Sequence, residues 1–324
     1  MQSENGRIGA TFINRMTQVH ALGPMIALVL LIIVLSVLTE SFFTFDNLFN
    51  VVQQSSINLI IGLGMTLVII SGGIDLSVGS VMALVGCSMA LISKHWPVPP
   101  LFAIALGLLF GVLVGAFNGF VISRTGIPDF IMTVGMLSAA RGLALIITGG
   151  LPVTGLPEQV TYFGAESIGP IPVAGIVALV MAVFAWFVLK YTKLGRNAYA
   201  IGGNREAARA AGIDVKNYKV YFYAFIGLMV AVAATVQVGR IFSANPLMGA
   251  RKELEVIAVV ILGGTNLFGG QGTIGGTILG ALIIGIIGNG LNLLNVSSFW
   301  QDFVIGTLII VVVIIDRLRH RGGG

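Results

Sequence analysis

The sequence predicts an all-α polytopic membrane protein with about ten transmembrane helices. Of its 324 residues, 56% are hydrophobic and only 10% are charged, whereas about a quarter of the residues of a soluble domain are charged. The mean hydropathy is +0.99. The apolar residues also form successive runs, most of them close to the roughly 20 residues that a helix needs to cross a bilayer. A water-soluble globule of this length could not bury so much apolar surface.

Ten spans are predicted in chain order, and the eighth is the shortest. They cover residues 21–39, 51–70, 77–93, 100–122, 128–148, 171–189, 220–238, 255–268, 274–292 and 299–315. The first run follows Arg7 and Arg15 as in a signal peptide, but no small-residue cleavage site precedes Glu40. We therefore interpret it as an uncleaved span. The whole chain, 1–324, is predicted to be a single transmembrane domain.

The basic residues predict the orientation, because cytoplasmic loops of membrane proteins carry an excess of Lys and Arg. With both termini in the cytoplasm, the cytoplasmic segments are the N-terminal tail 1–20, the loop 190–219 and the C-terminal tail 316–324. The loop 149–170 has no Lys or Arg and is predicted to be an irregular periplasmic loop. The basic residues then inside are Arg7, Arg15, Arg124, Lys190, Lys193, Arg196, Arg205, Arg209, Lys216, Lys219, Arg317, Arg319 and Arg321. Arg251 and Lys252 are predicted in an outer loop.

Two glycine ladders predict close helix packing. Gly107, Gly111, Gly115 and Gly119 recur every four residues in the fourth span, and Gly272, Gly276 and Gly280 repeat this spacing at the ninth. In lipid, small residues let helix backbones approach closely and so hold helices together. The ladders therefore indicate a multi-helix bundle.

A repeated glycine pattern interrupts the apolar runs near 71–79 and 262–272. Both stretches contain two adjacent glycines, then Asp75 or Asn266 two residues later, followed by a leucine. Paired glycines with a short polar residue break a helix, and corresponding interruptions in two halves of a chain are typical of a transport path. The alternative is a pair of tight turns between neighbouring spans, and the pattern favours neither.

Polar side chains within or beside the spans are candidates for a transport path. Ionisable groups are costly at membrane depth and so are functional candidates, and amides can hydrogen-bond hydroxyl groups. The alternative for the amides is hydrogen bonding between helices. The candidate path residues are Asn58, Asp75, Asn118, Arg141, Asn266, Asn289 and Asn292.

The sequence of the loop 190–219 predicts a short helix that docks on another protein. Asn204 is a suitable N-cap, Glu206 complements the first turn and Gly212 marks the end. In such a helix Ala207, Ala208 and Ala211 would form a flat face for another protein. The alternative, a basic loop that only orients the chain, does not require a capped alanine-rich helix. The candidate coupling residues are Gly195, Arg196, Gly202, Gly203, Asn204, Arg205, Glu206, Ala207, Ala208, Arg209, Ala211 and Gly212.

Several classes of enzyme are excluded by missing motifs. The chain contains no Gly-Lys pair and therefore no phosphate-binding P-loop. The GxGxxG pattern at 270–275 lacks the strand–helix–strand context of a dinucleotide site. His20, His95 and His320 are isolated, which leaves neither a metal cluster nor a histidine-based triad. No catalytic residue, metal or bound cofactor is predicted.

The motifs together resemble the permease subunits of ribose-type ABC transporters. The resemblance is carried by the stretches 195–204, 206–208 and 212–213 in the loop, and by 64–69 with 71–79. Residues 47–50, 254–258 and 288–294 also match, so the similarity extends from about 24 to 316.

This resemblance implies a permease for a monosaccharide of the ribose, xylose, arabinose or galactose class in a bacterial inner membrane. It implies three protein partners: a cytoplasmic ATPase that is a fused tandem subunit holding ATP and Mg²⁺, a periplasmic sugar-binding protein, and a second permease copy. Nucleic acid is not among the expected partners. An ion-coupled secondary transporter is the main alternative. It would need a relay of protonatable side chains in the membrane, and Asp75 and Arg141 alone make a poor relay. A membrane-embedded enzyme would need a catalytic constellation.

Overall fold

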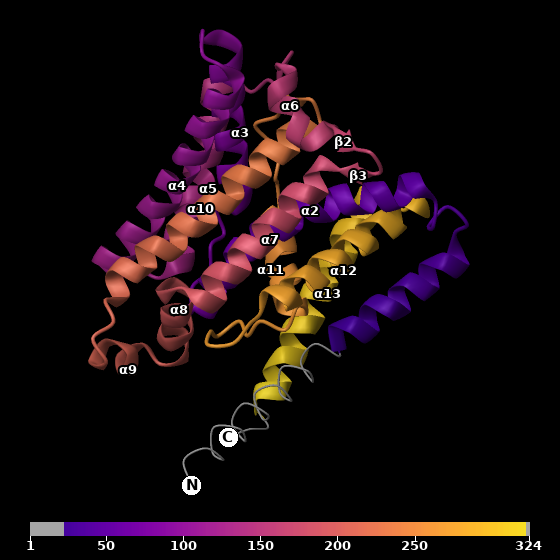
Figure 1. Cartoon of the computed structure of the whole chain (residues 1–324). Coiled ribbons are helices and arrows are strands. Elements are labelled where there is room, and N and C mark those ends of the chain that lie inside the picture. Colours follow the sequence, from indigo (N-terminus) through magenta and orange to yellow (C-terminus); the bar gives the residue numbers. More distant parts are fainter. Residues whose placement is uncertain (1–22, 322–324) are drawn as a thin grey trace.

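Residues 23–321 are described here from a computed structural model, in which long helices fan out from a common centre (Figure 1). An unlabelled helix, Gly23–Leu38, comes first. It is followed by α2 (Phe45–Ile70), α3 (Val78–His95), α4 (Pro100–Thr125), α5 (Asp129–Thr148), α6 (Glu158–Ala165), α7 (Val173–Tyr191), α8 (Lys193–Gly203), α9 (Arg205–Ala210), α10 (Val215–Arg240), α11 (Lys252–Leu262), α12 (Ile274–Leu293) and α13 (Ser298–Arg321).

The predicted fold class is confirmed, and each of the ten predicted spans contains a helix. Among residues 23–321, seven helices are long and apolar enough to cross a membrane, namely α2, α3, α4, α5, α7, α10 and α12. Helices α2, α3 and α10 are buried along most of their length and form the centre of the bundle. Helices α4, α5 and α7 expose most of their apolar residues, as expected for faces in contact with lipid.

The eighth predicted span, 255–268, is wrong in its length and bounds. Helix α11 has only 11 residues, which is about 16 Å and half of a hydrocarbon core. It ends at Leu262 because Gly263, Gly264 and a buried Thr265 follow, with Gly264 in the left-handed conformation (φ 82°). The irregular stretch 245–251 comes before it. At the C-terminus, α13 continues to Arg321 and so includes part of the predicted tail 316–324. The predicted tail 1–20 lies outside the described residues.

The loop 149–170 is more regular than predicted. It contains the two-residue strand β1 (Val153–Thr154), which pairs antiparallel with β4 (Ser243–Ala244), and the hairpin of β2 (Ser167–Ile168) and β3 (Ile171–Pro172). Helix α6 lies between them and packs on α10, where Gly164 meets the backbone of Gly239. This loop therefore caps one end of α10.

Both glycine ladders pack helices as predicted. Three residues of the α4 ladder, Gly111, Gly115 and Gly119, face α10, and a Cβ at Gly115 would overlap the carbonyl oxygen of Tyr223, while Gly107 faces Met89 of α3. In the second ladder, a Cβ at Gly280 would overlap the carbonyl oxygen of Val259 on α11. Backbone contact of this kind is possible only without a side chain, so the glycines hold α4 on α10 and α12 on α11.

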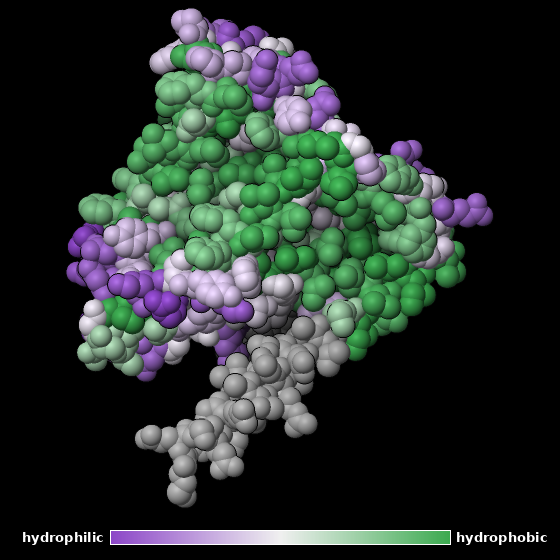
Figure 2. Space-filling view, in the orientation of Figure 1, coloured by the Kyte–Doolittle hydropathy of each residue, from purple (hydrophilic) through white to green (hydrophobic). Residues whose placement is uncertain are grey.

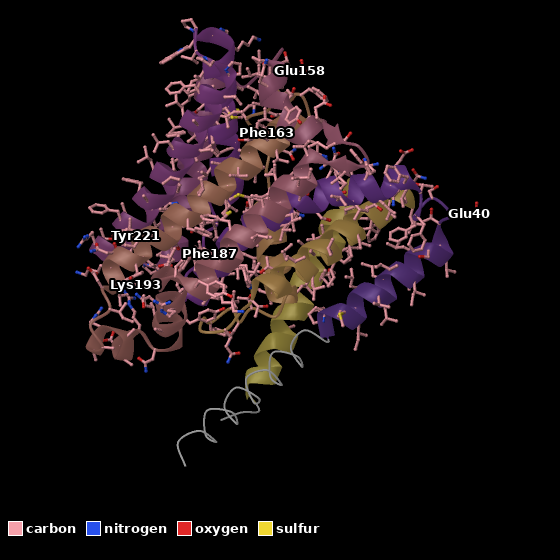
Figure 3. All side chains as sticks on the ribbon, in the orientation of Figure 1. Glu40, Glu158, Phe163, Phe187, Lys193 and Tyr221 are labelled. Carbon is pink, nitrogen blue, oxygen red and sulfur yellow. The ribbon has the colours of Figure 1, made fainter. Side chains whose placement is uncertain are left out.

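Polar surface is concentrated at two ends of the molecule, with an apolar band between them (Figure 2). Glu158 of α6 lies at the upper end, whereas Lys193 of α8 and Tyr221 of α10 lie toward the lower end (Figure 3). The loops 149–170 and 190–219 therefore lie on opposite sides of the apolar band. This placement agrees with the prediction that loop 149–170 is periplasmic and loop 190–219 is cytoplasmic.

Candidate functional site

The 190–219 loop forms two short helices instead of the single one predicted. Helix α8 begins after Thr192, whose hydroxyl accepts a hydrogen bond from the Leu194 N–H at 3.1 Å. Helix α9 is capped as predicted, because the Asn204 side chain accepts from the Ala207 N–H at 2.9 Å. Gly212 ends this region in the left-handed conformation (φ 82°).

The predicted flat alanine face is wrong in one member. Ala207 and Ala211 are exposed, but Ala208 points into the chain's own core and is only 5% exposed. The exposed side of α9 instead carries Arg205 and the ion pair between Arg209 and Glu206, whose N–O distance is 3.3 Å. The exposed surface of α9 is therefore a mixed charged and alanine surface.

The two glycine-rich stretches join helices and meet each other. We call residues 71–77, between α2 and α3, the first connection, and residues 263–273, between α11 and α12, the second connection. The N–H of Gly270 in the second connection donates to the carbonyl oxygen of Ile70, the last residue of α2, at 2.8 Å. These stretches are thus tight connections that pack together at one end of the bundle.

Helix α8 rests on this junction. A Cβ at Gly202 would overlap the carbonyl oxygen of Ile70 and would lie 2.7 Å from the Gly270 nitrogen. The Tyr199 hydroxyl donates to the carbonyl oxygen of Gly272 at 2.6 Å. Burial raises the pKa of Tyr199 to about 12, so this hydroxyl stays protonated and remains a donor. One face of α8 therefore contacts the end of α2 and the second connection together.

The first connection is held from both sides by polar contacts. Asp75 is buried and accepts hydrogen bonds from the Ser77 N–H (2.8 Å) and hydroxyl (2.6 Å), while Asn118 of α4 donates to the same hydroxyl at 3.2 Å. Burial raises the pKa of Asp75 to about 6, against the opposing effect of the Ser77 hydrogen bonds. Asp75 and Asn118 thus both bind Ser77 and shape the connection. They are the two predicted path residues that the structure brings together here.

A second set of contacts joins this connection to α5 and α10. The Tyr223 hydroxyl lies 2.9 Å from both the Ile74 carbonyl oxygen and the Asp129 carboxylate, and Lys219 pairs with Asp129 at 2.5 Å. Asp129 and Tyr223 were not among the predicted site residues. The signal available was an acidic residue at the second position of the predicted span 128–148, but nothing in the sequence indicates that Lys219 faces it.

Two of the predicted path residues lie far from this end. Asn58 is in the middle of α2, about 20 Å from its first residue and about 18 Å from its last. Its side-chain oxygen accepts from Lys252 Nζ at 2.9 Å, and the same Nζ pairs with Glu255 at 2.6 Å. Lys252 was predicted in an outer loop. This position is wrong, because its side chain reaches the middle of a transmembrane helix.

Arg141 holds the stretch that leads to α11. Its guanidinium donates to the carbonyl oxygens of Pro246 and Met248, and Glu253 is close enough for Coulombic attraction to it. The stretch also packs on α3, since a Cβ at Gly79 would overlap the carbonyl oxygen of Gly249. Irregular backbone is tolerated at membrane depth only where it is buried or lines a wet cavity. This stretch was not among the predicted sites.

The remaining predicted path residues have local or interhelical roles. Asn289 of α12 and Asn47 of α2 exchange side-chain hydrogen bonds of 2.7 and 3.0 Å while buried, which is the interhelical alternative considered above. Asn292 accepts from Gln301 of α13 at 2.7 Å. Asn266 accepts from the Phe268 N–H within the second connection at 2.8 Å.

The comparisons with known proteins agree with this architecture. Residues 47–313 match the family described as branched-chain amino acid transport system / permease component. The chain is 44% identical to the ribose import permease protein of Escherichia coli K12 over 304 residues, covering 91% of this chain and 93% of the relative. It is 40% identical to the D-allose transport system permease protein (86% of each chain) and 35% identical to a probable ABC transporter permease protein (95% and 92%), both also from Escherichia coli K12.

Proposed function

The chain belongs to the family of branched-chain amino acid transport system permease components, and we propose that it carries a monosaccharide of the ribose and allose class inward. It is a multi-pass membrane permease subunit and not an enzyme, as its relatives are named permeases. The ABC transporter among the relatives supports import driven by ATP. No ATP site is proposed on this chain, so ATP and Mg²⁺ belong to a partner.

The proposed partners follow from the two opposite polar ends. A cytoplasmic ATP-binding subunit, which the family resemblance implies to be a fused tandem, docks on the exposed side of α9, which offers Arg205, Ala207 and Arg209. A periplasmic sugar-binding protein docks near α6 at the other end (Figure 3). The excess of basic residues in the predicted inner segments supports a proposal that both termini lie in the cytoplasm.

The transport path is proposed to run between two copies of this chain. Asn58 and Arg141 face it at mid-depth, whereas Asp75 and Asn118 shape its cytoplasmic end. In a single copy, the charged side chains of Lys252 and Glu255 on α11 are partly exposed. Charged side chains are costly against lipid, and a second copy packed on this face would keep them away from it. Rocking of the two copies would alternate access to the path.

One observation carries the coupling mechanism, namely the contact of Gly202 with Ile70 and Gly270. Because α8 and α9 pack on each other, a displacement of α9 by the ATPase reaches α8 directly. Helix α8 lies on the carbonyl oxygen of Ile70, so its motion moves the end of α2 and the second connection together. An ion-coupled transporter has no ATPase, so it would not need α8 and α9 to transmit a displacement to α2.

Co-purification tests the docking surface. Ala207→Trp places a large side chain on the exposed side of α9 without entering the core, and we expect loss of ATPase association with normal membrane insertion. Glu40→Trp is the control, because Glu40 is exposed between the first helix and α2, away from both proposed docking surfaces (Figure 3). Full ATPase association of Ala207→Trp together with sugar uptake would contradict docking on α9.

A further inference from the structure

A group of charged side chains lies at mid-depth around the first turn of α11. It consists of Lys252, Glu253 and Glu255 on α11 and Arg141 on α5, with Asn58 of α2 beside Lys252. We call these five residues the mid-depth cluster. Its depth follows from Asn58, which lies near the middle of the 26-residue helix α2. Three of the five, Lys252, Glu253 and Glu255, have no assigned role in transport.

Structural stabilisation accounts for only part of the cluster. The Lys252–Asn58 hydrogen bond fastens α11 to α2, but the Lys252–Glu255 pair joins two residues three positions apart on the same helix and fastens α11 to no neighbour. The two side chains keep 20% and 25% of their surface exposed. Ionisable groups within a membrane face the interior of a bundle or a water-filled cavity. The exposed part of this cluster therefore faces the wet interior and not lipid.

The backbone also holds the cluster open. Arg251, immediately before α11, adopts the left-handed conformation (φ 63°), which is strained for a residue with a side chain and is typical of functional sites. Arg141 fastens the stretch before it through the carbonyl oxygens of Pro246 and Met248. Helix α11 consequently starts at mid-depth, and its first-turn side chains project where an uninterrupted span would present apolar residues.

We propose that the mid-depth cluster is a binding site for the hydroxyl groups of a sugar in transit. A hydroxyl both donates and accepts hydrogen bonds, so it can donate to the carboxylate of Glu255 and accept from Lys252, which lie on one face of α11. Hydrogen bonds to charged groups are about twice as strong as those between neutral groups. The half-exposed Leu254 precedes Glu255 on α11 and offers apolar surface to the C–H face of a sugar ring. The site rests on the proposed function.

The test uses the complete transporter reconstituted in liposomes, with the ATPase and with binding protein saturated by each sugar. Initial uptake is measured for D-ribose and for its 2-deoxy, 3-deoxy and 5-deoxy analogues, together with ATP hydrolysis. The variant is Glu255→Gln, which preserves size, and the control is Lys94→Met, because Lys94 contacts Thr154 in the outer loop, away from the cluster.

For the parent, we expect D-ribose uptake to exceed that of at least one deoxy analogue by about tenfold, the range for a lost hydrogen bond to a charged group. Glu255→Gln should lower D-ribose uptake by about tenfold and reduce this discrimination to about twofold, with ATP hydrolysis within about twofold of the parent. Lys94→Met should match the parent in all measurements.

Two results would overturn the site while leaving the proposed function intact. One is unchanged D-ribose uptake and unchanged discrimination in Glu255→Gln. The other is loss of ATPase association in both Glu255→Gln and Glu255→Asp, which would assign the pair a purely structural role. If the parent itself imports neither D-ribose nor D-allose with ATP, the proposed function fails and the site fails with it.

Discussion

Gly270 donates its backbone N–H to the carbonyl oxygen of Ile70 at 2.8 Å, and Gly202 packs on the same oxygen. Three segments that are far apart in sequence therefore meet at one atom: the end of α2, the second connection and helix α8. Because both contacts involve backbone atoms, they leave no room for independent motion. This junction is the structural basis of the coupling proposed above.

Substitution of Gly202 tests this junction. Gly202→Ala introduces a methyl group that overlaps the Ile70 carbonyl oxygen, so α8 must move away from the junction. We expect normal membrane insertion and ATPase association, with sugar uptake reduced at least tenfold. Gly203→Ala is a matched control, because no atom lies within 4 Å of a Cβ at Gly203. Equal uptake by the two variants would show that α8 does not act through Ile70.

Substitution of Asp75 tests the first connection. Asp75→Asn keeps a side-chain oxygen that can accept from Ser77, whereas Asp75→Leu removes the acceptor and leaves the buried Ser77 groups without it. An unsatisfied buried donor costs about 1–3 kcal/mol. We therefore expect Asp75→Leu to impair uptake and lower the Tm more than Asp75→Asn does. If both variants transport like the parent, Asp75 is dispensable for the shape of the connection.

The raised pKa of Asp75 predicts a pH dependence. Its value in the folded protein, about 6, is above the ordinary 3.8, so the folded protein binds this proton more tightly than the unfolded chain. The unfavourable contribution of the charge is fully present above about pH 6 and is lost as the pH falls toward 4. Asparagine does not titrate, so only the parent gains stability as the pH falls. The free energy of unfolding of Asp75→Asn minus that of the parent should therefore decrease by about 3 kcal/mol as the pH falls from above 6 to 4. Thermal unfolding in detergent between pH 4 and 8 measures it, and a constant difference would contradict the prediction.

The Lys219–Asp129 pair gives a third test. Its side chains are only 13% and 19% exposed, so each single change, Asp129→Asn or Lys219→Met, leaves a partly buried charge without its partner. We expect each to lower the unfolding free energy by about 1–3 kcal/mol, and the double variant to lose less than the sum. Thermal unfolding of all four proteins measures this coupling energy. Strict additivity would show that the pair does not contribute to holding the first connection.

Water access to α11 is a fourth test. The exposed Leu254 lies on the first turn of α11, whereas the exposed Leu113 lies on α4 among lipid-facing residues. In membranes, Leu254→Cys should react with a charged, membrane-impermeant thiol reagent, and Leu113→Cys should not. The native Cys87 is buried, so the parent provides the background. Protection of Leu254→Cys equal to that of Leu113→Cys would place α11 against lipid.

The spans and the ladders were predictable because they depend on local pattern alone. Runs of apolar residues long enough to cross a bilayer specify helices wherever they occur, and the four-residue spacing from Gly107 to Gly119 specifies a close helix contact. Only the partner of each ladder needed the structure. The cap at Asn204 was predictable for the same reason, since capping involves residues three positions apart.

The mid-depth cluster and the junction were not predictable, because both depend on contacts between distant segments. Arg251 and Lys252 look like an ordinary outer loop when depth is inferred by counting spans, and only the Lys252–Asn58 contact reveals their depth. Ala208 looks equivalent to Ala207 in sequence, and its burial depends on how α9 packs on the rest of the chain. The GG repeats at 71–79 and 262–272 indicated a break without indicating that the two breaks touch.

The most direct test of the account is accumulation of labelled D-ribose or D-allose by liposomes that contain this chain, its ATPase and its binding protein. The account predicts accumulation against a gradient that requires ATP, the binding protein and an unmodified Gly202, and that persists when a protonophore abolishes ion gradients. Accumulation that proceeds without the ATPase and stops with the protonophore would contradict it and would identify an ion-coupled transporter.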